Sequence, residues 1–158
     1  LRLSRGLGDV YKRQAEANAD ILACGSKADT FSFDAYVRRS RDGLGAFDLT
    51  AFSSEYQFCA YNEGQGVDEL VSVIDDFEDW LVSDENSLDS PYTYVVLAPD
   101  YETEEFDLAW GNFHQSKEMR EAGLANFLDT APEIQEAFDK VLSCQEPNGF
   151  NSGQIPLI

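Results

Sequence analysis

The sequence predicts an α+β domain in which one antiparallel sheet carries two helices on one face. Two observations predict this class. Residues 66–82 repeat apolar side chains with the period of an amphipathic helix, and short runs typical of strands precede and follow them. A second helical region follows the third such run, over residues 116–142. With a tail long enough for one more strand, the element order is βαββαβ.

The first strand is expected at residues 55–61, which are rich in aromatic side chains and end at the turn residues Asn62–Glu63–Gly64. The helix over 66–82 follows. Its apolar residues recur at spacings of three and four, as one buried face requires: Val67, Leu70, Val71, Ile74, Phe77 and Leu81. Acidic residues, Glu78 among them, take the opposite face. We expect that face to be solvated and to bind no metal, because side chains on the outside of a regular helix do not wrap a cation.

The second and third strands are expected at residues 92–98 and 106–113. The helical region after them divides at Pro132. Ser116 can cap the first helix, whose apolar residues are Met119, Leu124, Phe127 and Leu128. A capping box at Thr130–Glu133 starts the second helix, whose buried residues are Ile134, Phe138, Val141 and Leu142. Residues 154–158 are expected to supply the last strand.

The sheet face away from the helices is expected to be apolar. In a monomeric domain that face would be polar, yet the strand at 92–98 is apolar on both sides. Its two faces carry Tyr94 with Val96, and Val95 with Leu97. Such a sheet needs a second sheet over it. We therefore expect self-association, or packing against an upstream repeat missing from this chain, through the open sheet face.

The N-terminal residues are expected to lie outside this domain. The first fourteen resemble the in-frame translation of a transposase-type sequencing adapter, so we expect an open reading frame cut at its 5′ side. Glu16–Cys24 is similar to Glu136–Cys144, which favours an upstream repeat, although an unrelated N-terminal extension is the alternative. The expected domains are an adapter-derived segment at 1–14, a repeat remnant of helix and strand or an extension at 15–40, a linker at 41–52 and the folded domain at 53–158.

The formal net charge is -19, from 30 acidic and 11 basic residues. A charge this negative excludes nucleic acid and anionic membranes as partners, because like charges repel. Acidic disorder is disfavoured, since 43% of the residues are hydrophobic and 13% are aromatic. The sequence contains no apolar run long enough to span a membrane. These properties predict an acid-coated globular domain.

The chain has three cysteines, an odd number. Cys59 in the first strand and Cys144 after the last helix could form a disulfide, which would leave Cys24 unpaired. The alternative is two buried free thiols. A disulfide would be typical of a secreted or periplasmic protein and free thiols of a cytoplasmic one, so both locations stay open.

Several loose motifs carry a family resemblance: Phe58–Cys59 with Asn62–Glu63–Gly64, Leu97–Ala98–Pro99, Phe106–Asp107 with Trp110–Gly111, Gly123 and Cys144. With them, residues 53–158 resemble the dimeric α/β-barrel superfamily, whose ferredoxin-like domains pair sheet against sheet. In particular they look like secreted bacterial proteins of marine type. The resemblance implies the ferredoxin-like βαββαβ fold. It leaves the function open among small monooxygenases, haem-degrading enzymes, dye-type peroxidases and plain binding domains.

Two residues are candidates for catalysis. His114, the only histidine, could ligate haem or move a proton if it faced an interior, and otherwise caps the helix that begins near Ser116. Glu63 could act as a general base if burial raised its pKa, and otherwise belongs to a turn in which Gly64 takes a positive φ.

Aromatic residues on the strands are candidates for ligand binding. Tyr61, Tyr94 and Trp110, with Tyr56 beside them, could line a pocket together with His114, or could simply fill the core. No serine nucleophile motif, phosphate loop or zinc spacing is present. We therefore expect a domain that binds a small apolar or aromatic molecule or serves as an assembly module. A cofactor-independent monooxygenase-like enzyme, or a haem-binding protein, is the alternative.

Overall fold

The computed structural model describes residues 32–36, 47–88 and 91–153. The segment expected to derive from an adapter lies outside the described residues. So do the strand expected at 154–158, Cys24, most of the expected repeat remnant and the first half of the expected linker. With the exception of Ser32, the described residues belong to one unit, Phe33–Ile158.

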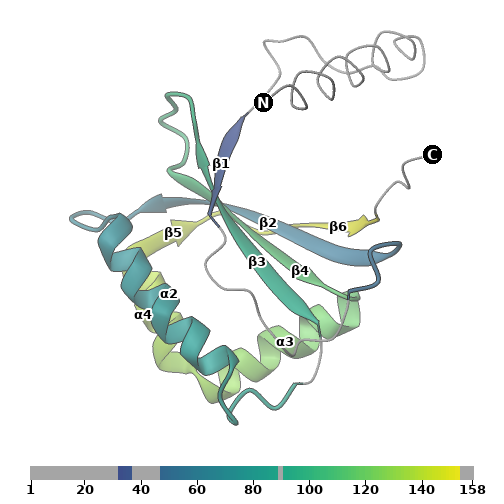
Figure 1. Cartoon of the computed structure of the whole chain (residues 1–158). Coiled ribbons are helices and arrows are strands. Elements are labelled where there is room, and N and C mark those ends of the chain that lie inside the picture. Colours follow the sequence, from purple (N-terminus) through teal and green to yellow (C-terminus); the bar gives the residue numbers. More distant parts are fainter. Residues whose placement is uncertain (1–31, 37–46, 89–90, 154–158) are drawn as a thin grey trace, which may run out of the picture. The chain divides into compact units, whose positions relative to one another are not determined.

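The described residues form six strands and three helices (Figure 1). In chain order these are β1 (Phe33–Tyr36), β2 (Phe52–Tyr61), α2 (Val67–Leu81), β3 (Tyr92–Pro99), β4 (Leu108–His114), α3 (Lys117–Thr130), α4 (Pro132–Val141), β5 (Leu142–Cys144) and β6 (Asn148–Ser152). The class is therefore α+β, as predicted from the sequence. Among these residues no helix is long and apolar enough to cross a membrane.

All strand pairs are antiparallel, and the sheet runs β1-β3-β4-β2-β5, with β6 also paired to β2. β2 has ten residues and takes two partners along one edge. β5 pairs with its end at Cys59–Tyr61, and β6 with its start at Phe52–Tyr56. The length of β2 thus allows two short strands, β5 and β6, to pair along the same edge.

The prediction of a simple ferredoxin-like βαββαβ fold with two helices is wrong. The described chain has three helices, and its sheet has six strands because β1 adds to the edge of β3 and both β5 and β6 pair with β2. The predicted division of the C-terminal helical region at Pro132 is confirmed, because Ala131 leaves helical geometry, with φ -141° and ψ 49°, and Pro132 then starts α4. The structure is a strand-rich α+β fold.

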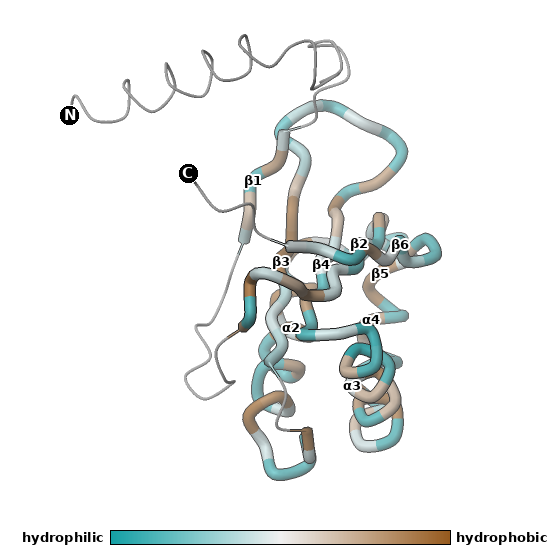
Figure 2. The backbone as a smooth tube through the Cα atoms, turned by 90° about the vertical axis from the view of Figure 1, so that its right-hand side faces the viewer, coloured by the Kyte–Doolittle hydropathy of each residue, from teal (hydrophilic) through white to brown (hydrophobic). Residues whose placement is uncertain are grey.

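The three helices lie on the same side of the sheet (Figure 1). Figure 2 shows hydrophobic and hydrophilic stretches alternating along these helices, as expected of elements with one buried face. The core lies between them and the sheet. Its buried residues come from both layers: Leu70, Ile74, Phe77 and Trp80 of α2, Tyr94 and Val96 of β3, Leu108 and Trp110 of β4, and Phe127, Val141 and Leu142 of the C-terminal elements.

The buried face of α2 differs from the predicted one. Val67 and Val71 are exposed, whereas Val73 and Trp80 are buried. Glu78, assigned to the solvated face, is only 1% exposed. The reason is a specific partner on β3, the Tyr94 hydroxyl, which donates a hydrogen bond of 2.5 Å to Glu78 Oε1.

Of the two predicted helix N-caps, one is confirmed and one is wrong. Ser116 caps α3, as expected, by accepting a hydrogen bond from the backbone N–H of Met119 at 3.2 Å. The capping box at Thr130 is wrong, because Ala131 is the N-cap of α4. Thr130 Oγ1 instead accepts from the indole N–H of Trp80 at 3.0 Å. A buried indole N–H requires a hydrogen-bond acceptor, and supplying one with Thr130 Oγ1 is more favourable here than capping the next helix.

Candidate functional site

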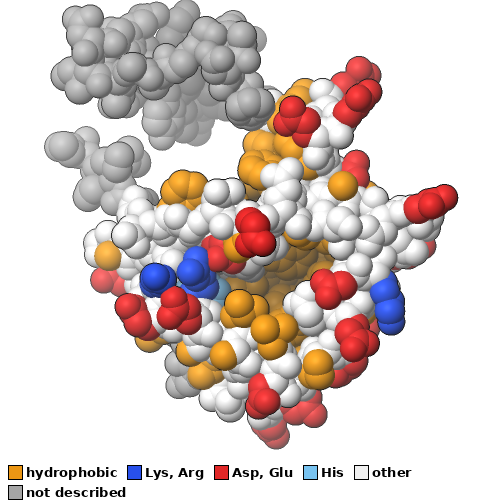
Figure 3. Space-filling model, turned by 180° about the vertical axis from the view of Figure 1, so that it is seen from behind, with side chains coloured by type: hydrophobic (Ala, Val, Ile, Leu, Met, Phe, Trp, Pro, Cys, Tyr) orange, Lys and Arg blue, Asp and Glu red, His pale blue; other side chains and the backbone are white. Residues whose placement is uncertain are grey.

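A cavity of about 610 Å³ lies between the sheet and the helices. Figure 3 shows it as a hollow with hydrophobic side chains at its bottom and basic side chains at one side. Alternate residues of two neighbouring strands form its roof, because successive side chains of a strand point to opposite faces. These are Glu55, Gln57 and Cys59 of β2, and Trp110, Asn112 and His114 of β4.

The helix side of the cavity is aromatic. Phe77 and Trp80 of α2 meet Phe127 of α3 and Phe138 of α4, with ring centroids 5.0–5.8 Å apart for the pairs Trp80–Phe127, Phe77–Phe127 and Phe77–Phe138. Trp110 faces them from β4, with its ring centroid 5.5 Å from that of Phe138. Edge-to-face rings packed in this way form a rigid wall, since each ring limits the rotation of its neighbours.

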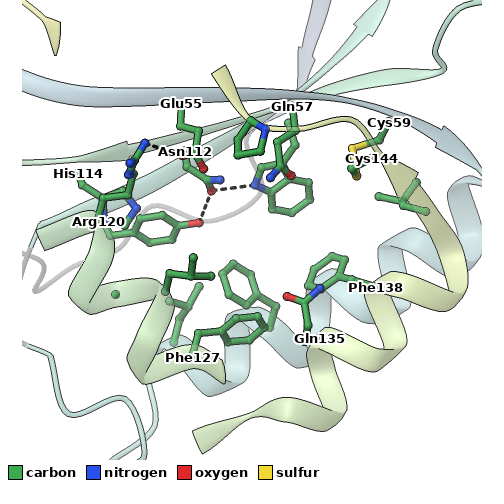
Figure 4. Close-up of a pocket in the computed structure, with 18 of the residues that line it drawn as sticks. Glu55, Gln57, Cys59, Asn112, His114, Arg120, Phe127, Gln135, Phe138 and Cys144 are labelled. Carbon is green, nitrogen blue, oxygen red and sulfur yellow. Dashed lines mark hydrogen bonds and ion pairs between the residues drawn. A yellow bond between two sulfur atoms is a disulfide. The ribbon is translucent and has the colours of Figure 1, made fainter. Parts of the chain in front are cut away.

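Asn112 holds a fixed orientation in the cavity roof. Its Oδ1 atom accepts a hydrogen bond of 2.9 Å from the indole nitrogen of Trp110 and one of 2.8 Å from the hydroxyl of Tyr92 (Figure 4). An indole N–H can only donate, so the atom that faces it must be the amide oxygen. The amide nitrogen of Asn112 therefore points away from both rings.

Arg120 of α3 forms an ion pair with Glu55 of β2, with 2.6 Å between Nη1 and Oε2. Their side chains are 23% and 15% exposed. The guanidinium also lies over Gly149 of β6, where an added Cβ would come within 2.8 Å of Nη1. Gly149 thus allows the Arg120 side chain to cross the sheet edge and reach Glu55.

His114 lies at the same end of the cavity and is only 8% exposed. Its ring centroid is 4.8 Å from that of Tyr92. Burial, and secondarily the positive charge of Arg120, lowers the His114 pKa to about 4. The imidazole is therefore neutral at pH 7. Its Nδ1 atom is buried and has no hydrogen-bond partner among the described residues.

The disulfide between Cys59 and Cys144 is part of the cavity wall. It joins directly opposed residues of β2 and β5, so the tail after α4 is held against the sheet (Figure 4). This pairing confirms the bridged alternative of the sequence analysis over two free thiols. Cys59 is 1% exposed, whereas Cys144 is exposed.

The structure separates the sequence-predicted site residues. Trp110 and His114 line the cavity. Tyr94 stacks on Trp110, with ring centroids 4.8 Å apart and planes within 5°, and supports it from the side. Tyr56 lies on the other sheet face, in edge contact with Phe113. The cavity is therefore on the helix side of the sheet, not on the open face where the pairing of two sheets would place it.

Tyr61 and Glu63 lie away from the cavity lining. Glu63 is exposed in a turn where Gly64 has φ +76°, which confirms the expected positive φ of that glycine. Tyr61 is half-buried, and its backbone N–H donates to Asp107 Oδ2 at 2.7 Å. Burial, together with the negative charge of Asp107, raises the Tyr61 pKa. Catalysis by Glu63, ligand binding by Tyr61 and haem ligation by His114 stay predictions.

Sequence reasoning missed Asn112, Glu55, Gln57 and Arg120. The alternation of side chains along a strand could have identified the three strand residues. Positions 55, 57 and 59 share one face of their strand, and positions 110, 112 and 114 share one face of theirs. Among the described residues, no group of three or more histidines, cysteines or carboxylates is placed to hold a metal ion.

Comparison of the chain with protein-family models, with curated proteins and with solved structures gives no match in any of the three. The geometry of the cavity is therefore the basis on which a function is inferred.

Proposed function

We propose that this protein binds a small, largely apolar molecule in the cavity between the sheet and the helices. The observation that carries the proposal is the aromatic lining, in which Trp110, Phe127 and Phe138 border a space of about 610 Å³. Ligand sites in proteins have volumes of roughly 300–1,000 Å³, apolar walls and a few fixed polar groups. The cavity has all three properties.

Tryptophan fluorescence tests this proposal directly. The chain has two tryptophans, Trp80 and Trp110, and both line the cavity. We expect isopropenylnaphthalene, an uncharged planar probe, to change their emission saturably. Gln57→Tyr places a larger side chain in the roof and should weaken binding at least tenfold. Thr93→Tyr puts the same side chain at an exposed position on the other sheet face and should leave binding unchanged. Linear, unsaturable quenching would contradict the proposal.

A second candidate function, assembly, is favoured by the sheet face away from the helices. Its side chains form a continuous aromatic row in which Phe52, Tyr56 and Phe150 contact Phe113 or one another. The outward positions of the described strands carry no charged residue, in a chain whose formal net charge is -19. A second copy of this chain is the partner favoured here, because two such faces can pair as stacked sheets without bringing like charges together.

Sedimentation velocity tests the assembly candidate. The wild-type chain should sediment as a dimer, and Val95→Glu, which places a charge on the outward face of β3, should shift it to a monomer. Ser72→Glu, on the exposed side of α2, is the matched control and should remain dimeric. A wild-type monomer at all concentrations tested would exclude this candidate and leave the cavity proposal untouched.

A further inference from the structure

We propose that the cavity ligand is uncharged and carries a carbonyl oxygen that accepts a hydrogen bond from the side-chain amide of Asn112. This inference rests on the proposed ligand-binding function and specifies its ligand class. It depends on three features of the cavity: a donor with a fixed direction, a neutralised cation, and the position of both beside the aromatic wall.

The fixed donor is Asn112 Nδ2. Two donors, the Trp110 indole and the Tyr92 hydroxyl, hold the amide oxygen at 2.9 and 2.8 Å and so exclude the flipped amide. The amide nitrogen makes no hydrogen bond to any described residue, although Asn112 is half-buried and lines the cavity. A half-buried amide nitrogen needs an acceptor when a ligand displaces solvent from it. An oxygen acceptor on the ligand meets this need.

His114 adds a second donor at the same end. Its buried Nδ1 has no partner among the described residues, and a lone pair left without a donor costs less than an N–H left without an acceptor. The neutral ring therefore places its proton on Nε2. Both polar side chains of β4 that line the cavity thus favour acceptor groups on the ligand.

Charge excludes an anionic head group. Among the described residues that line the cavity, Arg120 is the one basic side chain, and Glu55 already neutralises it at 2.6 Å. A carboxylate ligand would have to displace Glu55 and leave a partly buried carboxylate unpaired, which is costly. Three further lining residues, Glu121, Asp139 and Glu146, are acidic and repel anions. A cationic head group would be attracted by these carboxylates, but it carries only donors and would find no acceptor at the Asn112 amide nitrogen. An uncharged acceptor avoids both conflicts.

The acceptor must lie close to the aromatic body of the ligand. Trp110 belongs to both regions, because its ring packs edge to face with Phe138 in the wall and its nitrogen donates to Asn112. Asn112 is two residues further along the same strand face, a separation of roughly 7 Å. A planar ring system packed against this wall therefore brings a carbonyl attached directly to it within reach of Asn112. An aryl ketone has this arrangement.

Three probes that share one ring system and nearly the same shape separate the contributions of the carbonyl oxygen and of negative charge to the binding affinity. Isopropenylnaphthalene is apolar, acetylnaphthalene replaces its CH₂ by a carbonyl oxygen, and naphthoate carries a carboxylate. Affinities are measured by isothermal titration calorimetry on the full chain at pH 7. We expect acetylnaphthalene to bind about tenfold more tightly than isopropenylnaphthalene, the effect of one net hydrogen bond. Naphthoate should bind more weakly than acetylnaphthalene.

Asn112→Asp tests the donor itself. The carboxylate keeps an acceptor for Trp110 and Tyr92 but has no N–H, so the tenfold preference for the carbonyl should disappear. Asn148→Asp adds the same charge at an exposed position outside the cavity lining and should keep the preference. The ratio of two affinities is unaffected by a general loss of binding, and the wild-type ratio stands even if a variant fails to fold.

The outcomes separate the two proposals. If isopropenylnaphthalene binds and the carbonyl gives no advantage, the ligand class is wrong and the cavity proposal stands. Tightest binding of naphthoate, or a preference that persists in Asn112→Asp, also overturns the ligand class. If no probe binds, both proposals fail.

Discussion

The disulfide between Cys59 and Cys144 should supply much of the stability of this domain. It closes a loop with a sequence separation of 85 residues. In the chain-entropy description, closing a loop of that length lowers the entropy of the unfolded chain by an amount equivalent to about 4.6 kcal/mol at 25 °C. Domains of this size have unfolding free energies of about 5–15 kcal/mol. Loss of the bond should therefore remove a third or more of the total.

The assay is urea unfolding followed by tryptophan fluorescence. For Cys59→Ala/Cys144→Ala we expect the midpoint to fall by about 2 M, given slopes of about 1–3 kcal/mol/M for small proteins. Reduction of the wild-type chain should cause a similar fall without any change of volume at the buried Cys59. Cys24→Ser is the control, because it removes a cysteine and keeps the bond. A loss below about 1.5 kcal/mol in both the double variant and the reduced chain would show that the disulfide is not a major source of stability.

Three further predictions concern single side chains. The His114 pKa of about 4 lies below the unfolded value of 6.5, so the unfolded chain takes up the proton first. The free energy of unfolding should therefore fall as the pH drops from 6.5 to 4, by about 1–2 kcal/mol after solvent screening. Urea unfolding of His114→Gln at both pH values should lack this loss, and identical pH dependence would contradict it. Glu78→Ala removes the acceptor of the buried Tyr94 hydroxyl and should lower the free energy of unfolding by about 2–3 kcal/mol in thermal unfolding. The exposed Asp76→Ala should lower it by less than about 0.5 kcal/mol, and equal losses would contradict the buried hydrogen bond. Gly111→Ala would place a Cβ 2.9 Å from a Tyr56 ring carbon and should cost about 1–3 kcal/mol in urea unfolding, so an unchanged midpoint would disprove this close packing.

The regular spacing of apolar residues made α2 predictable from the sequence, whereas the low strand propensity of its residues made β6 unpredictable. The spacing of apolar residues placed a helix at 66–82, and the structure has it at Val67–Leu81. β6, by contrast, has the sequence Asn-Gly-Phe-Asn-Ser, which has the composition of a turn. It forms a strand because the long edge of β2 offers unpaired hydrogen-bonding groups, and this tertiary demand outweighs local propensity.

The cavity was only partly predictable for a related reason. Trp110 and His114 could be singled out as aromatic and titratable residues, but their neighbour Asn112 has no chemical signature of its own. Its importance comes from Tyr92 on the adjacent strand and Trp110 on its own strand, which together fix the amide. Arg120 likewise acquires its role from Glu55, 65 residues earlier in the chain. Such pairings follow from strand register and helix placement, which composition does not encode.

The most direct test of ligand binding in the cavity is a nitrogen–proton correlation spectrum recorded during addition of acetylnaphthalene. If the probe binds in the cavity, the two indole signals, from Trp80 and Trp110, and the side-chain amide signal of Asn112 should shift together and saturate at one equivalent of bound probe. Shifts confined to residues of the opposite sheet face, such as Tyr56 and Phe113, would contradict it, as would a spectrum that does not change.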